Sequence, residues 1–191
     1  QLAQQAQRLV ERGWAANVDS IIAESLRRYL ESHQESLTEQ FLREVAREHP
    51  KVQFELVGGG DCPTNGVPWR QARWTLKGEL EALARFDIGL MPLPEEEWAL
   101  GKSGGKARTY MAAGVVPVCT AIGYNLELIR HGETGFLCST EPEWREVLVK
   151  LIEDAPLRQR IAAAARKDVE GRFSIQKQAR ALRAVFDTVL S

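Results

Sequence analysis

The sequence predicts an α/β fold with a mainly parallel sheet, helices on both faces and extra helices at the N-terminus. From residue 50 onward, short β-branched runs alternate with helical patterns, which is the order of strands joined by crossover helices. Glycine clusters at 58–60, 101–105 and 123 each follow a predicted strand. Carboxyl ends of parallel strands meet at one sheet edge, where ligands gather. The three glycine clusters are therefore expected to lie along the same edge.

Composition limits the chain to one core and a local binding site. The 191 residues are 44% hydrophobic, enough for one domain with appendages. Basic and acidic residues nearly balance, 25 against 26, so broad nucleic-acid binding is not expected. Any anion recognition must therefore be local.

Cysteine usage and hydropathy indicate the setting. Cys62, Cys119 and Cys138 are widely spaced and lack paired ligands, which argues against a disulfide framework or structural zinc and favours the reducing cytoplasm. No apolar run has the length of a membrane span, and the start lacks a signal pattern. The sequence predicts a soluble, cytoplasmic protein and leaves peripheral membrane contact open.

Residues 1–49 are expected to form a helical segment ahead of a domain at 50–191. Apolar residues recur at helical spacing through this segment, with no clean strand among them. In its last helix the expected apolar stripe is Leu37, Phe41, Leu42 and Val45. Pro50 ends that helix, and apolar residues alternate with polar ones over 52–57, which predicts the first strand.

The middle of the chain predicts a loop, a helix and a βαβ unit. We expect a surface loop over 61–72, a short strand over 73–75 and a helix over 77–85. An apolar run at 88–93 is followed by a glycine- and lysine-rich loop, a short helix and a second β-branched run, the order of a βαβ unit. The expected apolar stripe of the helix at 77–85 is Leu76, Leu80, Leu83 and Ala84.

The C-terminal third predicts a strand and three amphipathic helices. A short helix begins near Gly123, and a turn leads into a strand at 136–138. Thr140 and Glu143 form a capping-box pattern, and Asp154 is expected to cap a helix through Lys167. Ser174 is expected to cap the last helix. The stripes expected in the core are Trp144, Val147, Leu148, Leu151 and Ile152, and then Leu182, Val185, Phe186 and Val189.

The loop at 101–106 carries the clearest chemistry. A helix start exposes unpaired backbone N–H groups and the positive end of the helix dipole, and glycine lets a ligand approach the backbone. Lys102 and Lys106 add full charges to the same place. The loop therefore predicts a phosphate site, with a plain solvent-exposed glycine loop as the alternative.

Two better-known phosphate motifs do not fit. A P-loop requires a glycine where this chain has Glu96, and Gly104 and Gly105 separate the Lys-Ser pair from the helix. A dehydrogenase fingerprint requires its glycines to run into a helix, whereas 58–60 run into Asp61, Cys62 and Pro63.

Three runs resemble the donor-binding C-terminal domain of group 1 glycosyltransferases, retaining enzymes that use nucleotide-diphosphate sugars. They are FDIGLMPLP, GKSGGKARTYMAAGVVPV and GYNLELIRHGETGFL. The resemblance spans 52–190, and its most specific parts are 110–114 with Pro117, then Glu127 and 134–136. It implies a single Rossmann-like domain, the C-terminal half of a GT-B architecture, whose acceptor domain precedes it.

The resemblance also implies which residues meet the donor. The loop before the central helix would hold the diphosphate, the segment at 123–127 the sugar and diphosphate, and the segment at 73–75 the base. The implied donor-binding residues are Lys102, Ser103, Gly104, Gly105, Lys106, Thr109, Gly59, Gly123, Asn125, Glu127, Arg73 and Trp74. No catalytic side chain and no metal ligand are assigned within this chain.

Several of these residues also have ordinary structural interpretations. Either lysine could be a solvated surface charge, and Trp74 a buried core residue. Asn125 could be only a helix cap, and Glu127 a carboxylate favoured by the helix dipole. His131 is interpreted as structural or exposed, and His33 and His49 are not proposed as catalysts.

The chain departs from the family pattern in two places. The family often has two glutamates eight positions apart, where this chain has Gly101 and Thr109, and a threonine hydroxyl makes a weaker ribose contact at most. The family's opening strand and its diphosphate-gripping Arg and Lys have no recognisable counterpart in 1–49.

The sequence thus predicts the nucleotide-sugar-binding domain of a metal-independent retaining glycosyltransferase that needs no cofactor. Its partners would be a nucleotide-sugar donor and the acceptor domain of the full-length enzyme, without which the isolated chain is expected to be inactive. The alternative is a non-catalytic nucleotide-binding or interaction domain of the same fold. A sugar-nucleotide epimerase or a phosphorylase on a similar fold is a third.

Overall fold

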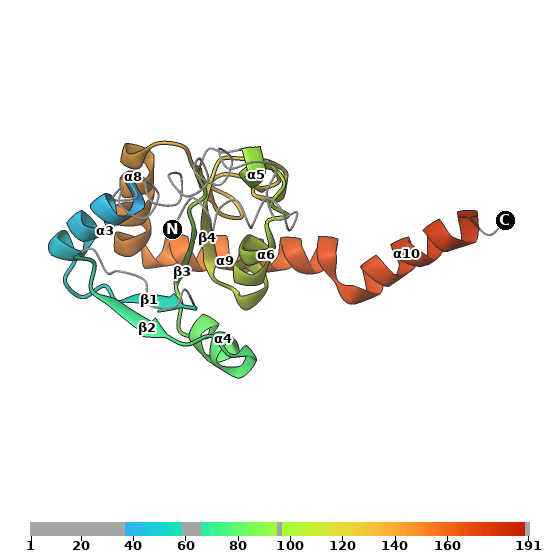
Figure 1. Ribbon diagram of the computed structural model, residues 1–191, viewed down its shortest axis with the longest axis horizontal. Coiled ribbons are helices and arrows are strands. Elements are labelled where there is room, and N and C mark those ends of the chain that lie inside the picture. Colours follow the sequence, from blue (N-terminus) through green and yellow to red (C-terminus); the bar gives the residue numbers. More distant parts are fainter. Residues whose placement is uncertain (1–36, 59–65, 95–96, 190–191) are drawn as a thin grey trace, which may run out of the picture. The chain divides into compact units, whose positions relative to one another are not determined.

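The computed structural model describes residues 37–58, 66–94 and 97–189 (Figure 1). The chain divides into two compact units, Gln1–Gln40 and Phe41–Ser191, and nearly all described residues belong to the second. The expectations for residues 1–36, for Gly59 and for Cys62 lie outside the described residues. The domain boundary expected after residue 49 stays a prediction.

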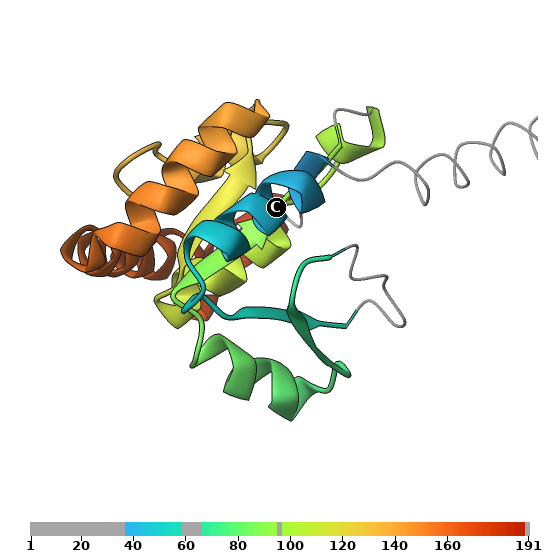
Figure 2. The ribbon, with the colours of Figure 1, turned by 90° about the vertical axis from the view of Figure 1, so that its left-hand side faces the viewer.

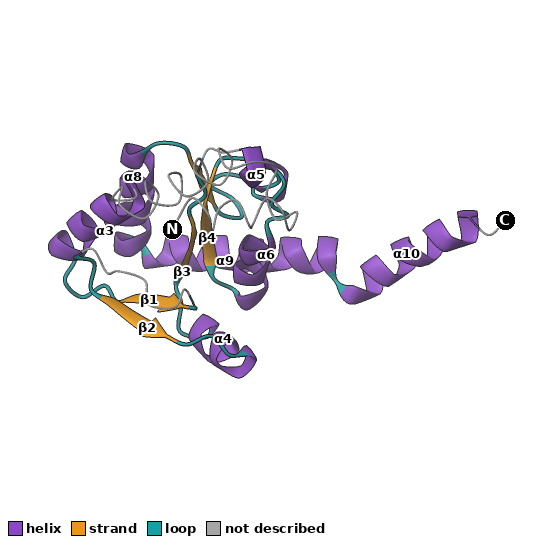
Figure 3. Cartoon of the chain, in the orientation of Figure 1, coloured by secondary structure: helices purple, strands orange, loops and turns teal. Residues whose placement is uncertain are grey.

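Helices and strands follow one another in the α/β order expected from the sequence (Figure 3). They are α3 (Leu37–Glu48), β1 (Phe54–Val57), β2 (Trp69–Ala72), α4 (Leu76–Leu83), β3 (Ile88–Met91), α5 (Glu97–Leu100), α6 (Gly105–Ala113), β4 (Val116–Thr120), α7 (Asn125–Leu128), β5 (Phe136–Cys138), α8 (Glu141–Glu153), α9 (Ala155–Phe173) and α10 (Ile175–Val189).

The described strands pair in parallel but form two sheets. β1 pairs with β2, and β3, β4 and β5 form a second sheet in that order. In Figure 2, β1 and β2 (teal) lie apart from the other strands. The parallel arrangement is confirmed, and the glycine clusters that were expected at one edge are divided between two sheets.

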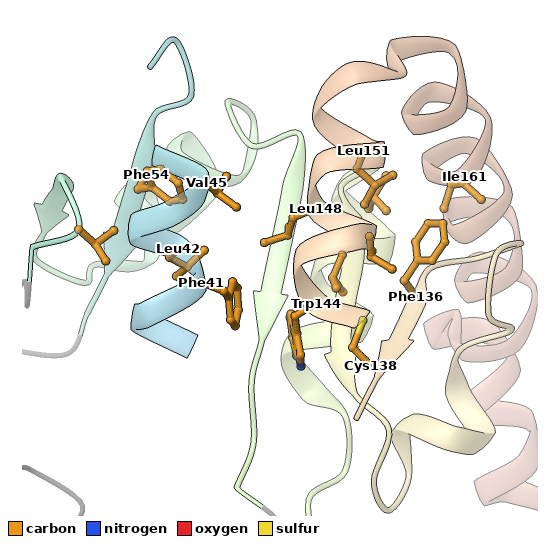
Figure 4. Close-up of a cluster of buried hydrophobic side chains, with 14 residues drawn as sticks. Phe41, Leu42, Val45, Phe54, Phe136, Cys138, Trp144, Leu148, Leu151 and Ile161 are labelled. Atoms are coloured by element: carbon orange, nitrogen blue, oxygen red, sulfur yellow. The ribbon is translucent and has the colours of Figure 1, made fainter. Parts of the chain in front are cut away.

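Helices cover both faces of the three-stranded sheet, as predicted. On one face, α3 and α8 contribute to a core that also holds Val118 and Phe136 (Figure 4). Phe41 of α3 stacks on Trp144 of α8, with ring centroids 5.7 Å apart. On the other face, α6 and α9 enclose a second core around Met111. All five residues of β4 are buried, which is typical of a central parallel strand.

The capping residues in the C-terminal third correctly predicted where α8 and α9 begin. The capping box of Thr140 and Glu143 begins α8, and the backbone N–H groups of Ser139 and Thr140 donate to the Glu143 carboxylate at 2.7 and 3.4 Å. Asp154 caps α9 by accepting from the Leu157 N–H at 2.8 Å. α9 runs on to Phe173, six residues beyond the expected Lys167, and continues through Gly171.

Between β1 and β3, the sequence-based assignment was wrong in two respects. Trp69–Ala72 forms β2 inside the expected loop, whereas the expected strand at 73–75 is the approach to α4, with Thr75 as its N-cap. In the α4 stripe, Leu83 is buried while Leu76 and Leu80 are exposed. Among the described residues β2 pairs with β1 alone, and its central residues Arg70 and Gln71 are exposed, so it lacks the apolar run that marks a buried strand.

The α8 stripe is confirmed, but the α10 stripe was wrongly placed in the core. Leu151 of α8 is fully buried. In contrast, Leu182, Val185, Phe186 and Val189 are all more than half exposed, and α10 buries no residue in the part of the chain that the structure describes. Helical periodicity shows that a face is apolar, and it does not show which surface covers that face.

Two leucines, one in α8 and one in α10, test this distinction. Leu151→Ala should lower the free energy of unfolding by about 2–5 kcal/mol, because it removes buried methyl groups and leaves a cavity. Leu182→Ala, the matched control on α10, should change it by no more than about 0.5 kcal/mol. Urea denaturation of the purified chain measures both, and equal losses would contradict the assigned burial.

Candidate functional site

The N-terminus of α6 lies at the carboxyl end of the β3–β4–β5 sheet, after β3 and the single turn of α5. Gly104 is its N-cap and adopts a left-handed conformation, with φ +65°, that glycine tolerates best. No side chain caps this end, so the first backbone N–H groups of the helix are open to a ligand. Lys102 and Lys106 flank it and are both exposed. The start of the helix dipole therefore has two exposed lysines within two residues of its N-cap.

Close packing at Gly104 joins this loop to the segment after β4. A Cβ atom on Gly104 would lie 2.9 Å from Cδ2 of Leu128 and 3.4 Å from Oδ1 of Asn125. Only glycine fits without displacing these side chains. The loop at 101–105 and the segment at 123–128 are thus brought together, as predicted.

Asn125 has a structural role in this junction. Its side chain is buried, and Nδ2 donates to the Thr120 carbonyl at 3.0 Å. Tyr124, not Asn125, occupies the N-cap position of α7, so the interpretation of Asn125 as a cap was wrong. The Thr120 hydroxyl in turn accepts from the Leu93 N–H at 2.7 Å and donates to the Leu93 carbonyl at 3.1 Å. These bonds fix the ends of β3 and β4 to each other.

Gly123 allows the α5 turn to approach. A Cβ at this position would lie 2.9 Å from the Leu100 carbonyl oxygen, and its φ of +52° is also unfavourable for other residues. Sequence reasoning predicted a ligand role for Gly123 and did not predict α5 at all. The structure shows that Gly123 is required for backbone packing against α5.

Other side chains of the predicted site make local contacts. The Thr109 hydroxyl donates to the Gly105 carbonyl at 3.1 Å. Arg108 donates to the Ser103 hydroxyl at a long 3.5 Å. The Lys102 ammonium lies over the Trp98 ring, 4.2 Å from its centroid. Glu127 is an exposed carboxylate in the first turn of α7. Since α7 is a single turn, it offers little helix dipole of its own.

Arg73 and Trp74 lie beyond β2, in the two-stranded sheet. Trp74 is 55% exposed, so its interpretation as a buried core residue was wrong. Its indole N–H donates to the Glu79 carboxylate at 2.8 Å. Among the described residues, no hydrogen bond or ion pair connects either side chain to α6. The described contacts therefore do not link this segment directly to the α6 N-terminus.

An ion-pair network behind the site was not anticipated from the sequence. Asp168 of α9, whose side chain is 10% exposed, accepts from Arg130 at 2.7 Å and from Arg172 at 3.1 Å. Arg172 also donates to the carbonyls of Leu128 and Glu127, at 3.1 and 3.2 Å. The spacing of Asp168 and Arg172 signals a helix pair, but nothing in the sequence indicates the contact with α7.

This network lowers the pKa of the Asp168 carboxyl. Burial alone would raise that pKa, but hydrogen bonds and charge from Arg130 and Arg172 outweigh it and hold the pKa below its ordinary value. The carboxylate is therefore ionised wherever the site functions near neutral pH.

His131 fits the expectation of a structural or exposed residue. It is exposed, its Nδ1 accepts from the Leu137 N–H at 3.2 Å, and its ring meets Phe136 edge-on. Cys119 and Cys138 are free and buried. In the described ranges, no group of three or more His, Cys, Asp or Glu residues could hold a metal ion. No helix within those ranges is long and apolar enough to cross a membrane.

Comparison with known proteins identifies relatives of this fold. A family model described as Glycosyl transferases group 1 matches residues 23–154. A search of curated protein sequences found no match. The C-terminal domain of LpcC, a glycosyl transferase group 1 family protein from Francisella tularensis, has a TM-score of 0.57 and 19% identity, covering 72% of this chain and 80% of that one.

Two larger structures are also similar. HepE from Anabaena, bound to UDP-glucose, has a TM-score of 0.62 and 18% identity, covering 81% of this chain and 45% of that one. TarM from S. aureus, in a complex that includes UDP, has a TM-score of 0.65 and 13% identity, covering 81% and 33%. These likenesses confirm the Rossmann-like fold of a GT-B C-terminal domain. The chain spans less than half the length of HepE and TarM.

Asp168→Asn should destabilise the chain in a pH-dependent way. The folded-state pKa is lowered, so the carboxylate stabilises the fold above its unfolded pKa of about 4 and loses this effect as pH falls through the folded value. At pH 7 the variant should lose about 1–3 kcal/mol of unfolding free energy, and the loss should shrink near pH 3. Urea denaturation at both pH values measures it.

Glu170→Gln is the matched control, because Glu170 pairs with Arg166 on the exposed side of the same helix. It should cost about 0.5 kcal/mol or less at either pH. A loss for Asp168→Asn that is the same at pH 3 and pH 7 would contradict the role given to its charge.

Proposed function

Because the chain belongs to the group 1 glycosyltransferases, we propose that it is the domain of a retaining enzyme that binds the nucleotide-diphosphate sugar donor. The single observation that carries this proposal is the uncapped α6 N-terminus with Lys102 and Lys106 beside it. HepE was solved with UDP-glucose and TarM with UDP, which supports a nucleotide-sugar ligand for a domain of this fold.

The geometry suits a departing diphosphate. Backbone N–H groups at a helix start bind phosphate oxygens without rearranging, and the dipole favours negative charge there. Ammonium groups from Lys102 and Lys106 would stabilise the charge that develops on the leaving diphosphate, which is the largest contribution in many such transfers. With that charge supplied by lysines, we propose that the transfer needs neither a metal ion nor a cofactor.

The remaining predicted residues have unequal support. Gly104 supports the proposed diphosphate site directly, because the absence of a side chain lets the loop at 101–105 pack against Asn125 and Leu128. Trp74 has a ring that is exposed and able to stack on a nucleobase, so we keep Arg73 and Trp74 as the proposed base-contacting segment. Three further residues contact the protein's own backbone, so their proposed roles toward the donor are indirect. Asn125 and Thr109 donate hydrogen bonds to backbone carbonyls, and Gly123 packs against Leu100.

The acceptor domain is the proposed partner. More than half the length of HepE and TarM has no counterpart in this chain, and the attacking acceptor hydroxyl would come from that part of the enzyme. The exposed apolar stripe of α10 is a surface that such a domain could cover. We propose a cytoplasmic setting, because the three cysteines are widely spaced in the sequence and Cys119 and Cys138 are free.

One observation favours a non-catalytic binding domain instead. Gly101 and Thr109 replace the acidic pair expected from the family resemblance, and the Thr109 hydroxyl already donates to the Gly105 carbonyl. Donor binding without transfer, even with the acceptor domain supplied, would favour this second function.

Calorimetric titration with UDP and GDP tests the proposed site. Lys102→Ala or Lys106→Ala should weaken binding by about 1.5–3 kcal/mol, because each removes a charge-assisted phosphate contact. Lys167→Ala, which removes an exposed lysine on α9, should leave the affinity unchanged. Failure of the unmodified chain to bind either nucleotide, or unchanged affinity in both lysine variants, would refute the site.

A transfer assay tests whether the chain needs the proposed acceptor domain. The purified 191-residue chain should release nucleotide from a UDP-sugar at no more than the background rate, because no acceptor domain positions an attacking hydroxyl. Product analysis by mass spectrometry measures transfer. Rapid turnover by this chain alone would show that it carries an acceptor site of its own.

A further inference from the structure

Trp98 is an exposed aromatic residue beside the proposed diphosphate site. Its side chain is 49% exposed, so burial in the core does not account for it. The ring lies under the Lys102 ammonium, with 4.2 Å between Nζ and the ring centroid. An ammonium group at this distance from an indole face is attracted by the negative charge of the π-system.

The α5 turn that carries Trp98 is firmly anchored. Ala99 is 1% exposed, and its carbonyl accepts from the Lys102 N–H at 3.1 Å. The next backbone segment, at Leu100, packs directly on Gly123, where no Cβ could be accommodated. The indole is therefore attached to a backbone fixed at both the protein core and the 123–128 segment.

An aromatic partner suits a lysine that must meet an anion. A free lysine side chain loses rotamer entropy when it is held in place. A carboxylate partner would hold it but would also neutralise its charge, whereas an indole ring leaves the positive charge available. No ion pair in the described parts of the chain includes Lys102.

We propose that Trp98 is a positioning residue that holds the Lys102 ammonium in place for the donor diphosphate at the α6 N-terminus. This inference rests on the proposed function, because it assumes that a diphosphate binds there. Trp98 acts through Lys102 and makes no contact with the donor. Lys102 is then ordered in the unbound protein, so ligand binding has a smaller entropic cost.

A double-mutant cycle isolates this effect. The full chain and the variants Trp98→Leu, Trp98→Phe, Lys102→Met and Trp98→Leu with Lys102→Met are titrated calorimetrically with UDP and GDP. Trp98→Leu should weaken nucleotide binding about threefold to tenfold. Trp98→Phe keeps an aromatic face and should recover most of that loss. With Lys102→Met already present, Trp98→Leu should have no further effect, because the ammonium is gone.

The outcomes separate the two proposals. If the unmodified chain binds neither nucleotide, the proposed function and this inference both fall. If it binds, and Lys102→Met weakens binding while Trp98→Leu does not, only the inference is overturned. Equal weakening by Trp98→Leu with and without Lys102 overturns it too, since Trp98 would then act on the ligand or on the fold directly. Trp98→Gln provides a second non-aromatic variant, and thermal unfolding confirms that each variant is folded.

Discussion

The close packing of Gly104 against Leu128 and Asn125 is the constraint on which the proposed site depends. It brings the start of α6 close to the segment after β4, and a side chain at 104 would have to displace Leu128 and adopt an unfavourable φ of +65°. Hydrogen bonds from Asn125 to Thr120 and between Thr120 and Leu93 then tie both segments to the ends of β4 and β3. The position of the helix dipole is therefore set by the sheet.

A second group of contacts holds this junction from behind. Arg172 donates to the last carbonyls of α7 and pairs with the Asp168 carboxylate. The same carboxylate pairs with Arg130, so Asp168 of α9 links α9 to the turn after α7. The backbone beside the site is thus held by packing and hydrogen bonds, while the side chains that would meet an anion, Lys102 and Lys106, stay exposed. The two parts have different tasks. The fixed backbone sets the position of the N–H groups, and the exposed lysines supply charge that a ligand can reach.

The predicted site has one part joined by direct packing and one part with no described bond to it. The loop at 101–106 and the segment at 123–128 meet, and the prediction from parallel topology was right for these two strands. The segment at 73–75 belongs to the sheet of β1 and β2 and makes no described bond to α6. Strand order in space decides which loops become neighbours, and the chain sequence gives only their order along the backbone.

The sequence by itself determined the elements whose local chemistry is unambiguous. The capping box at Thr140 and Glu143 and the apolar stripe of α8 each depend on residues within one helix, so periodicity and caps were enough to predict them. Tertiary structure alone decided that the α10 stripe is exposed, that Gly123 serves α5, and that Asp168 supports α7. Each of these depends on which distant surface lies opposite a residue. Such contacts leave no periodic signal in the chain, because they join residues 20 or more positions apart through packing geometry.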